Sequence, residues 1–270
     1  MTKSYHKGYT EFYGSESRRL DRDLIVEEPL SIRVQGNPYS VVMRTPGDEI
    51  AHTAGFCLAE GLVDSPDEIA TISFCSEDET NVATVTLTDK RQSCIAGLLE
   101  RKGFVSQTSC GICGKELIDD ISQILHPATG ISVFEADRIM ACIDTLSSNQ
   151  PLYKKTRGAH AAAIFDKNMI QMASAEDVGR HNALDKAIGK VFMEKRIKEA
   201  CLGVMSSRLS YELVQKAARA GLEILVGISM PTALAVDLAD SVNMTIACTK
   251  NRRLMVFCGD QRIIPGPAGK

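Results

Sequence analysis

The alternation of hydrophobic and polar residues changes its period along the chain. The first half contains two pairs of β-rich runs, each pair joined by a short polar turn. These predicted strands cover residues 29–34, 39–44, 69–75 and 82–87. A helix is predicted after each pair, one capped by Asp48 and ending at Gly61, the other over residues 89–102. The order hairpin, helix, hairpin, helix indicates a small α+β unit with an antiparallel sheet.

The second half begins after a Pro- and Gly-containing segment at residues 127–130 and alternates short apolar strands with helices. The predicted helices cover residues 135–147, 183–192, 211–220 and 232–239. The predicted strands cover residues 159–165, 169–173, 201–205, 224–228, 244–248 and 254–258. Strands that are apolar at nearly every position are buried on both sides, so this half predicts a sheet with helices on both faces.

We therefore expect an α/β protein in three parts. Residues 1–24 are polar and charged and form an N-terminal arm. Residues 25–128 form a small α+β domain that carries a Cys-x-x-Cys loop. Residues 129–270 form a second domain, a three-layer arrangement of one sheet between helices.

A chain of 270 residues with 44% hydrophobic and 24% charged residues has the profile of an ordinary globular protein. Its net charge of −3, its 5% of aromatic residues and its lack of Trp argue against nucleic acid as a partner. The longest uncharged apolar stretch, residues 224–236, contains Pro231 and is too short to cross a bilayer. The polar first residues show no secretory signal, so we expect a cytoplasmic protein without a membrane partner.

Cys110 and Cys113 are the one close pair among nine cysteines. Glycines flank them, and apolar residues at helical spacing follow from Leu117 onward, so the pair is placed at the start of a helix. The helix dipole and Lys115 favour a thiolate at this position. A thiolate that substrate can approach is able to attack a sulfur donor and to hold the sulfur as a persulfide.

Three other interpretations of this cysteine pair stay open. A thioredoxin-like dithiol requires a preceding strand, whereas residues 95–102 have a helical pattern. A structural zinc site usually needs a second Cys or His pair at metal spacing, which the sequence lacks, so we expect no metal of the protein's own. Two inert buried thiols are disfavoured because the surrounding glycines pack poorly.

Two polar segments stand at the starts of predicted elements. One contains His160 and leads into a strand, and the other contains Gly179, Arg180, His181 and Asn182 and leads into a helix. Unpaired backbone N–H groups beside cationic side chains make a helix start an anion or nucleotide site. Capping with a surface histidine would explain one such segment, but two in succession favour a binding site.

A third basic segment, residues 250–253, lies between two predicted strands. Taken alone, four such residues are best explained as a charged hairpin turn.

The strand and helix order of residues 135–258 also matches a zinc-dependent nucleotide deaminase. That reaction needs His-x-Glu at one helix start and Pro-Cys-x-x-Cys at the next. His181 is followed by Asn182 and Ala183, without the Glu, and the helix that starts near Ser210 has no cysteine. The sequence therefore predicts a deaminase-like scaffold without deaminase chemistry.

Over residues 28–257 the sequence resembles the FdhD/NarQ family of formate dehydrogenase accessory sulfurtransferases. The most specific shared stretches are Thr-Pro-Gly-Asp-Glu at 45–49, Ser-Cys-Gly-Ile-Cys-Gly-Lys at 109–115 and Glu-Asp-Val-Gly-Arg-His-Asn-Ala-Leu-Asp-Lys-Ala-Ile-Gly at 176–189. The resemblance implies a cytoplasmic sulfurtransferase that takes persulfide sulfur from a cysteine desulfurase. It passes this sulfur to the molybdenum cofactor, bis-molybdopterin guanine dinucleotide, before the cofactor enters apo-formate dehydrogenase. The resemblance also implies a homodimer and a cytidine deaminase-like fold for residues 129–270.

The same resemblance assigns roles to individual residues. Cys110 would hold the persulfide, with Cys113 assisting. The cofactor-contacting turn of the family maps onto Cys248, Thr249, Lys250, Asn251, Arg252 and Arg253. Arg253 matches the family pattern Phe-x-Arg-Gly-x-Arg, whereas Cys248, Lys250 and Asn251 depart from it. We expect the guanine nucleotide ends of the cofactor to be held by this turn and by the segments around His160 and Arg180-His181.

A function of a different class also fits these residues. A non-catalytic chaperone would bind the cofactor or the apo-formate dehydrogenase, and its cysteines would be dispensable. Replacement of Cys110 separates this alternative from a sulfur carrier.

Overall fold

The structure of the chain is a computed structural model that describes residues 2–75, 81–96, 125, 127–128, 130 and 132–266. Cys110 and Cys113 lie outside the described residues, as does the part of the helix predicted beyond residue 96. The described part is a mixed α/β protein built around a four-stranded and a six-stranded sheet. Among the described helices, none combines the length and apolar character needed to span a membrane.

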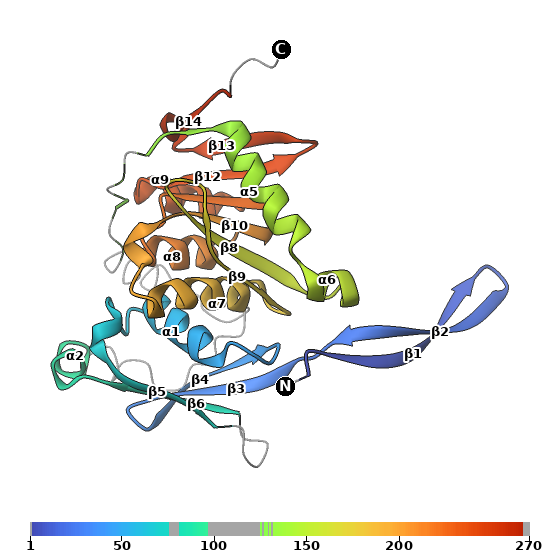
Figure 1. Cartoon of the computed structure of the whole chain (residues 1–270), viewed down its shortest axis with the longest axis horizontal. Helices are drawn as coiled ribbons and strands as arrows, with labels where there is room; N and C mark the ends of the chain where they lie inside the picture. Colours follow the sequence, from blue (N-terminus) through green and yellow to red (C-terminus); the bar gives the residue numbers. More distant parts are fainter. Residues whose placement is uncertain are drawn as a thin grey trace.

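The N-terminal arm is a long β-hairpin that projects from the body of the protein (Figure 1). Strand β1 (Ser4–Tyr13) pairs antiparallel with β2 (Glu16–Ile25), and nearly all of their side chains are exposed. The root of the hairpin is held by Lys155, whose Nζ donates to Ser4 Oγ at 2.9 Å and lies 3.3 Å from Asp23 Oδ1. The arm therefore has regular structure although it buries little surface.

The four-stranded sheet consists of β3 (Glu28–Val34), β4 (Asn37–Arg44), β5 (Ile69–Cys75) and β6 (Val82–Leu87) in the order β4-β3-β6-β5. Both predicted hairpins are confirmed, but the prediction of a purely antiparallel sheet is wrong because β3 and β6 pair in parallel. Helix α1 (Glu49–Ala59) connects the two hairpins in the chain, and the second hairpin joins the sheet through its second strand, β6. The short helix α2 (Asp89–Cys94) follows β6.

The six-stranded sheet has the order β13-β12-β11-β10-β8-β9. Its strands are β8 (His160–Asp166), β9 (Gln171–Asp177), β10 (Ala200–Arg208), β11 (Ile224–Ser229), β12 (Thr245–Lys250) and β13 (Arg253–Cys258). Strands β10, β11 and β12 are parallel, and β8 and β13 run against them. The parallel strands at the centre explain why their sequences are almost continuously apolar.

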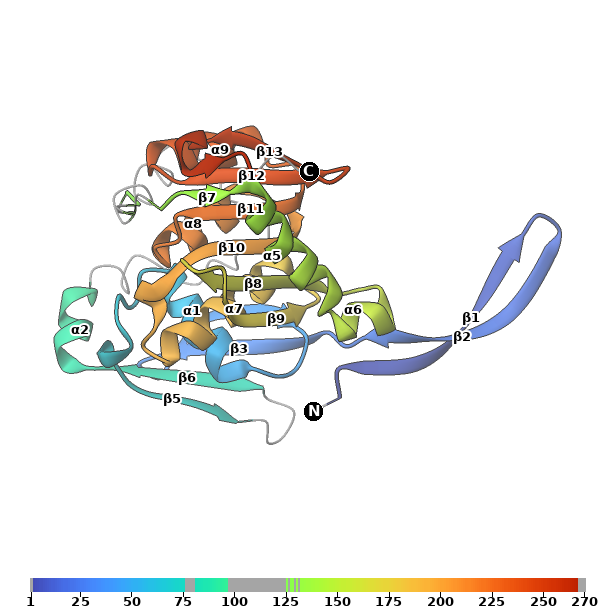
Figure 2. The same cartoon turned by 45° about the horizontal axis from the view of Figure 1, so that its top comes forward.

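Helices cover both faces of this sheet, as predicted (Figures 1 and 2). These helices are α5 (Ala136–Ser148), α6 (Pro151–Thr156), α7 (Arg180–Met193), α8 (Tyr211–Arg219) and α9 (Ala233–Ser241). Along β8, Ala161, Ala163 and Phe165 face the core under α5, whereas Ala162 and Ile164 face the core under α7, α8 and α9. A small parallel pair, β7 (Phe134–Glu135) with β14 (Ile263–Ile264), lies beside α5.

Helices α1 and α7 lie side by side between the two sheets (Figures 1 and 2). One core contains Leu30 and Ile32 of β3, Phe56 of α1 and Leu184 and Ile188 of α7. The small sheet is therefore packed through α1 onto the face of the large sheet. The start of α7 therefore lies next to the end of β4, between the small sheet and the large sheet.

Candidate functional site

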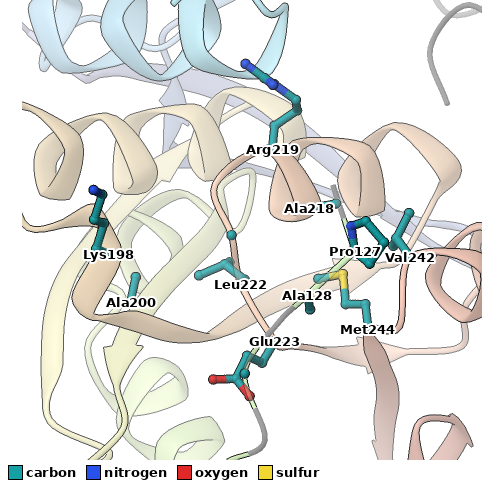
Figure 3. Close-up of a pocket in the computed structure, with 12 residues that line it drawn as sticks. Pro127, Ala128, Lys198, Ala200, Ala218, Arg219, Leu222, Glu223, Val242 and Met244 are labelled. Atoms are coloured by element: carbon teal, nitrogen blue, oxygen red, sulfur yellow. The ribbon is translucent and has the colours of Figure 1, made fainter. Parts of the chain in front are cut away.

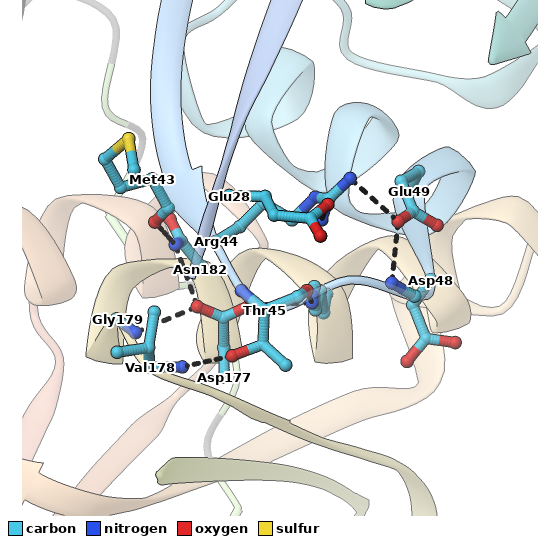
Figure 4. Close-up of polar contacts among 12 residues, drawn as sticks. Glu28, Met43, Arg44, Thr45, Asp48, Glu49, Asp177, Val178, Gly179 and Asn182 are labelled. Carbon is cyan, nitrogen blue, oxygen red and sulfur yellow. Dashed lines mark hydrogen bonds and ion pairs between the residues drawn. The ribbon is translucent and has the colours of Figure 1, made fainter. Parts of the chain in front are cut away.

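A buried carboxylate organises the start of α7 (Figure 4). Asp177, at the end of β9, is fully buried. Its Oδ1 accepts hydrogen bonds from Gly179 N at 2.8 Å and Asn182 Nδ2 at 2.9 Å. Its Oδ2 accepts from Thr45 N at 3.0 Å and from Lys186 Nζ at 2.7 Å. Burial lowers the pKa of Lys186, but the adjacent Asp177 opposes this shift, and the pair ties α7 to the end of β4.

The loop from β4 to α1 is held by a second set of charges. Arg44 is fully buried, and its guanidinium lies 3.1 Å from Glu28 Oε2 and 3.2 Å from Glu49 Oε1 (Figure 4). Glu49 Oε1 also accepts from Gly47 N at 2.6 Å. A buried guanidinium with two carboxylates keeps its charge compensated, so this loop forms a rigid support beside the start of α7.

Asp48 occupies the N-cap position of α1, as predicted, but the predicted side-chain cap is wrong. Its backbone is left-handed, with φ of 62°, and the side chain makes no capping hydrogen bond. The carboxylate instead lies 3.0 Å from Lys190 Nζ of α7. A contact with a helix distant in sequence has replaced the local contact.

The carboxyl edge of the six-stranded sheet brings together most of the predicted binding residues. Strand β9 ends at this edge, β8 begins there, and His160 lies directly opposite Asp177 in the pairing of the two strands. Helix α7 starts immediately afterwards with Arg180 and His181. Burial lowers the pKa of His160, and the positive charges of Arg180 and His181 lower it further. A lowered histidine pKa beside two cationic groups marks a local positive region that suits an anion.

The basic segment at residues 250–253 lies at the same edge, at the far end of the sheet. Lys250 pairs with Arg253, and Asn251 and Arg252 form a two-residue turn with φ of 51° and 58°. The predicted hairpin turn is confirmed, with the left-handed backbone that such turns require. Arg252 Nη2 lies 3.9 Å from Asp144 Oδ2 of α5, but its side chain is 88% exposed, so this ion pair is weak.

Strands β10 and β11 separate these two clusters. Three strand spacings between β8 and β12 amount to about 14 Å. Arg208 and Ser229, which pair with each other at the ends of β10 and β11, lie between them. A ligand that contacts both clusters must therefore be extended along the edge.

Two predicted residues are committed to the interior. Asn182 is buried, and its Nδ2 donates to Met43 O at 2.7 Å as well as to Asp177. Cys248 is buried with its Sγ 3.4 Å from Met230 Sδ, and burial raises the pKa of its thiol. In this structure both side chains support the edge from inside, and their contact with a ligand stays a prediction.

Two further residues at the edge were missed by the sequence reasoning. The Nε2 of His181 lies 3.3 Å from Ser210 Oγ and 3.7 Å from Glu212 Oε2. The neighbouring His181 ring holds the pKa of Glu212 at about 2, with help from Ser210. The polar Ser-x-Glu at a helix start after an apolar strand was visible in the sequence, but its contact with a residue about 30 positions earlier was not.

Metal-binding side chains do not gather at this edge in the described part of the chain. Within the described ranges, no three His, Cys, Asp or Glu side chains lie close enough together to hold a metal ion. The donors available there are cationic or hydroxyl groups, which suit phosphate oxygens.

A cavity of about 410 Å³ lies at the opposite, amino edge of the sheet (Figure 3). Two of its charged wall residues are bound internally: Arg219 donates to Asp64 Oδ1 at 2.6 Å, and Glu223 accepts from Ser132 Oγ at 2.7 Å. Ligands of open α/β sheets bind outside the carboxyl ends of the strands. The carboxyl edge is therefore the better candidate site.

Comparison with known proteins gives relatives along most of the chain. The profile of the FdhD/NarQ family matches residues 25–264. Sulfur carrier protein FdhD of Mycobacterium tuberculosis is 39% identical over 253 residues, which cover 89% of this chain and 91% of the relative. Sulfur carrier protein FdhD of Anaeromyxobacter dehalogenans is 34% identical over 261 residues and 91% of each chain.

A solved structure shares the fold. The crystal structure of a protein from Desulfotalea psychrophila, described as a formate dehydrogenase accessory protein, matches with a TM-score of 0.78 and 22% identity. The match covers 97% of this chain and 100% of that one. The arrangement of sheets and helices is thus common to both proteins.

Proposed function

Since the chain belongs to the FdhD/NarQ family, we propose that it is a sulfur carrier that delivers persulfide sulfur to the molybdenum cofactor required by formate dehydrogenase. The arrangement of residues at the carboxyl edge of the six-stranded sheet supports this proposal. His160, Arg180 and His181 lie at one end of that edge, and Lys250 and Arg253 lie at the other. This arrangement suits a ligand with two anionic nucleotide ends.

Bis-molybdopterin guanine dinucleotide is such a ligand, and here it is a substrate. Its pyrophosphate groups need cationic donors, which Arg180 at the start of α7 and Arg253 at the turn supply. Because the two clusters are about 14 Å apart, one mononucleotide contacts only one of them, and each cluster can bind a GDP molecule of its own. The whole cofactor would contact both.

Cys110 is the proposed persulfide carrier. Its thiolate attacks the outer sulfur of a persulfide on a cysteine desulfurase, the S–S bond of the donor breaks, and the thiolate of the donor leaves. The sulfur keeps its oxidation level, so this step needs no oxidant or reductant. Cys113 assists, and both residues lie in the part of the chain that the structure does not describe.

The expected partners are the desulfurase, apo-formate dehydrogenase and a second copy of this chain, all in the cytoplasm. The exposed hairpin supports a contact with another protein. Tyr5 and Tyr9 of β1 lie opposite Leu24 and Leu20 of β2, so these four side chains share one face. Exposed aromatic side chains on an isolated two-stranded ribbon indicate a surface that a partner covers.

The experiment that tests the function replaces Cys110 with Ala. The protein is incubated with a cysteine desulfurase and cysteine, and its peptides are examined by mass spectrometry. We expect one added sulfur atom on the peptide that contains Cys110, and none in Cys110→Ala. Cys75→Ala is the matched control, because Cys75 is an exposed free thiol on β5 with no assigned role.

Restoration of formate dehydrogenase activity in a deficient strain separates the two candidate functions. A sulfur carrier loses this ability in Cys110→Ala and keeps it in Cys75→Ala. A chaperone keeps it in both variants, and that result would refute the proposal.

A further inference from the structure

The N-terminal hairpin of β1 and β2 has two free edges. In the described part of the chain these strands pair only with each other, and the hairpin projects from the body of the protein (Figures 1 and 2). A two-stranded ribbon is marginally stable by itself, whereas three or more strands with an apolar face are stable. An exposed strand edge is also a template for pairing with another chain. The hairpin is therefore an incomplete sheet that a further strand would complete.

The two ends of the hairpin show which backbone groups lie on the free edge of β1. At the root, Val26 N donates to Lys3 O at 3.0 Å. At the tip, Tyr13 and Glu16 pair across a two-residue turn, and the pair that closes such a turn is hydrogen-bonded. Hydrogen-bonded pairs alternate with non-hydrogen-bonded pairs along an antiparallel ribbon. The odd-numbered residues of β1 therefore bond to β2, and the even-numbered residues present their N–H and C=O groups outward.

One face of the hairpin carries an uncompensated pair of positive charges. Lys7 lies directly opposite Arg22, and within the described residues neither has an ion pair. Like charges directly opposite each other destabilise a ribbon. On the same face Glu11 lies opposite Arg18 and accepts a hydrogen bond from its Nε at 2.6 Å. Lys7 therefore lacks the carboxylate partner that Arg18 has.

A second copy of β1 supplies that carboxylate when it lies antiparallel along the free edge. Outward-facing groups must meet each other, so an even-numbered residue lies opposite an even-numbered one. With Gly8 opposite Thr10 of the second copy, Lys7 lies opposite Glu11 of the second copy, and the same pair forms again across the two-fold axis at Tyr9. A shift of two residues in either direction separates both charge pairs. A shift of four places either Lys7 or Glu11 opposite itself.

We propose that the hairpins of two copies of this chain pair edge to edge through β1, antiparallel about a two-fold axis at Tyr9, and form one four-stranded sheet. Tyr5 of each copy then lies opposite Tyr13 of the other. The three tyrosines, 39–85% exposed in one copy, form a continuous aromatic face with those of the second. The proposed function includes a second copy as a partner. This inference adds the surface and is independent of the sulfur chemistry.

Analytical ultracentrifugation of the full chain in low salt, where exposed charges are least screened, tests the charge pairs. We expect a dimer for the wild type. Lys7→Glu and Glu11→Lys each place two pairs of like charges in the interface, which should weaken self-association by about fivefold or more. In an equimolar mixture of these two variants the heterodimer has two pairs of opposite charges and should regain most of the affinity. Lys167→Glu, at an exposed position outside the hairpin, is the matched control and should associate like the wild type.

A disulfide cross-link tests the register. The Cα atoms of a non-hydrogen-bonded pair are about 4.5 Å apart, within the range of a disulfide. On oxidation Tyr9→Cys should therefore link two chains through its own peptide, as identified by mass spectrometry. Tyr5→Cys lies on the same face but opposite Tyr13 of the other copy, so it should form no such link. A monomeric wild type, a mixture that associates no better than either variant alone, or equal cross-linking in Tyr5→Cys overturns the proposal. Failure of persulfide loading on Cys110 in a dimeric wild type refutes the sulfur-carrier function and leaves the pairing of the hairpins intact.

Discussion

Gly55 of α1 and Gly189 of α7 face each other where the two helices cross, with their backbones in direct contact. A Cβ on Gly55 would lie 2.0 Å from Asp185 O, and a Cβ on Gly189 would lie 1.8 Å from Ala51 O. No side chain fits at either position. This crossing holds the small sheet against α7 and thereby supports the start of α7, where Arg180 and His181 stand.

Gly189→Ala should destabilise the fold by about 3 kcal/mol or more, because the added methyl group meets the backbone of another helix. Within an exposed helix the same change stabilises by about 1 kcal/mol. A loss of stability in Gly189→Ala therefore indicates the close contact between α1 and α7. Urea unfolding measures the difference. Gly8→Ala is the control, since its Cβ would meet only the flexible side chains of Asp21, at 3.2 Å, and Arg19, at 3.5 Å, and it should leave stability nearly unchanged. Equal stability of Gly189→Ala and the wild type would contradict the helix crossing.

Stability should fall in mild acid because of His52. This side chain is wholly buried in α1, and burial together with Lys186, Lys216 and Arg44 lowers its pKa well below the usual value. The unfolded chain binds a proton at His52 below about pH 6.5, whereas the folded chain does not. The free energy of unfolding therefore decreases as pH falls, by up to about 1.4 kcal/mol per pH unit from this group.

Urea unfolding between pH 7.5 and 5 checks this expectation with His52→Met, which cannot titrate. The variant should lose the contribution of His52 to the slope, so its stability relative to the wild type improves as pH falls. His6→Gln, on the exposed hairpin, should behave like the wild type. Parallel curves for the wild type and His52→Met would show that His52 takes up its proton in the folded state.

Arg253→Ala should weaken GDP binding. Loss of one charge-assisted hydrogen bond costs about 1.5–3 kcal/mol, which corresponds to roughly a tenfold to hundredfold loss of affinity. Persulfide loading on Cys110 should be unaffected, because the two functions belong to different segments. Calorimetry with GDP measures the affinity, and Arg252→Ala, at the exposed neighbouring position, is the comparison. Unchanged affinity in Arg253→Ala would leave residues 250–253 as a solvated turn.

The purified protein should contain no stoichiometric zinc. His160 and His181 have no cysteine partners at ligand spacing in the sequence, and a tightly bound zinc ion requires about four such ligands. Elemental analysis of the full chain, which includes Cys110 and Cys113, decides the matter. One zinc ion per chain that survives dialysis against a chelator would disprove this expectation.

Local patterning located most of the strands and helices, but it missed the hairpin of β1 and β2, whose residues were predicted only as a polar arm, and the short helix α6. Alternation in residues 69–75 and 82–87 predicted β5 and β6 with their observed bounds, and apolar residues at helical spacing predicted α5 and α7 to within three residues at each end. The reason is physical: periodicity reports which side of an element is buried, and that is a property of neighbouring residues. The motif around Cys110 was likewise visible in the sequence, although its geometry lies outside the described residues.

Contacts between distant segments required the folded chain. The parallel pairing of β3 with β6, the contact of Gly55 with Gly189 and the approach of Glu212 to His181 join residues from about 30 to more than 130 positions apart. Periodicity contains no information on which element packs against which, because many pairings bury the same apolar faces. The path of the chain selects one of them, and it gathers His160, Arg180 and the Arg253 turn at a single edge. The sequence thus contains the residue types of an anion site, and the order of the strands brings them together along one edge.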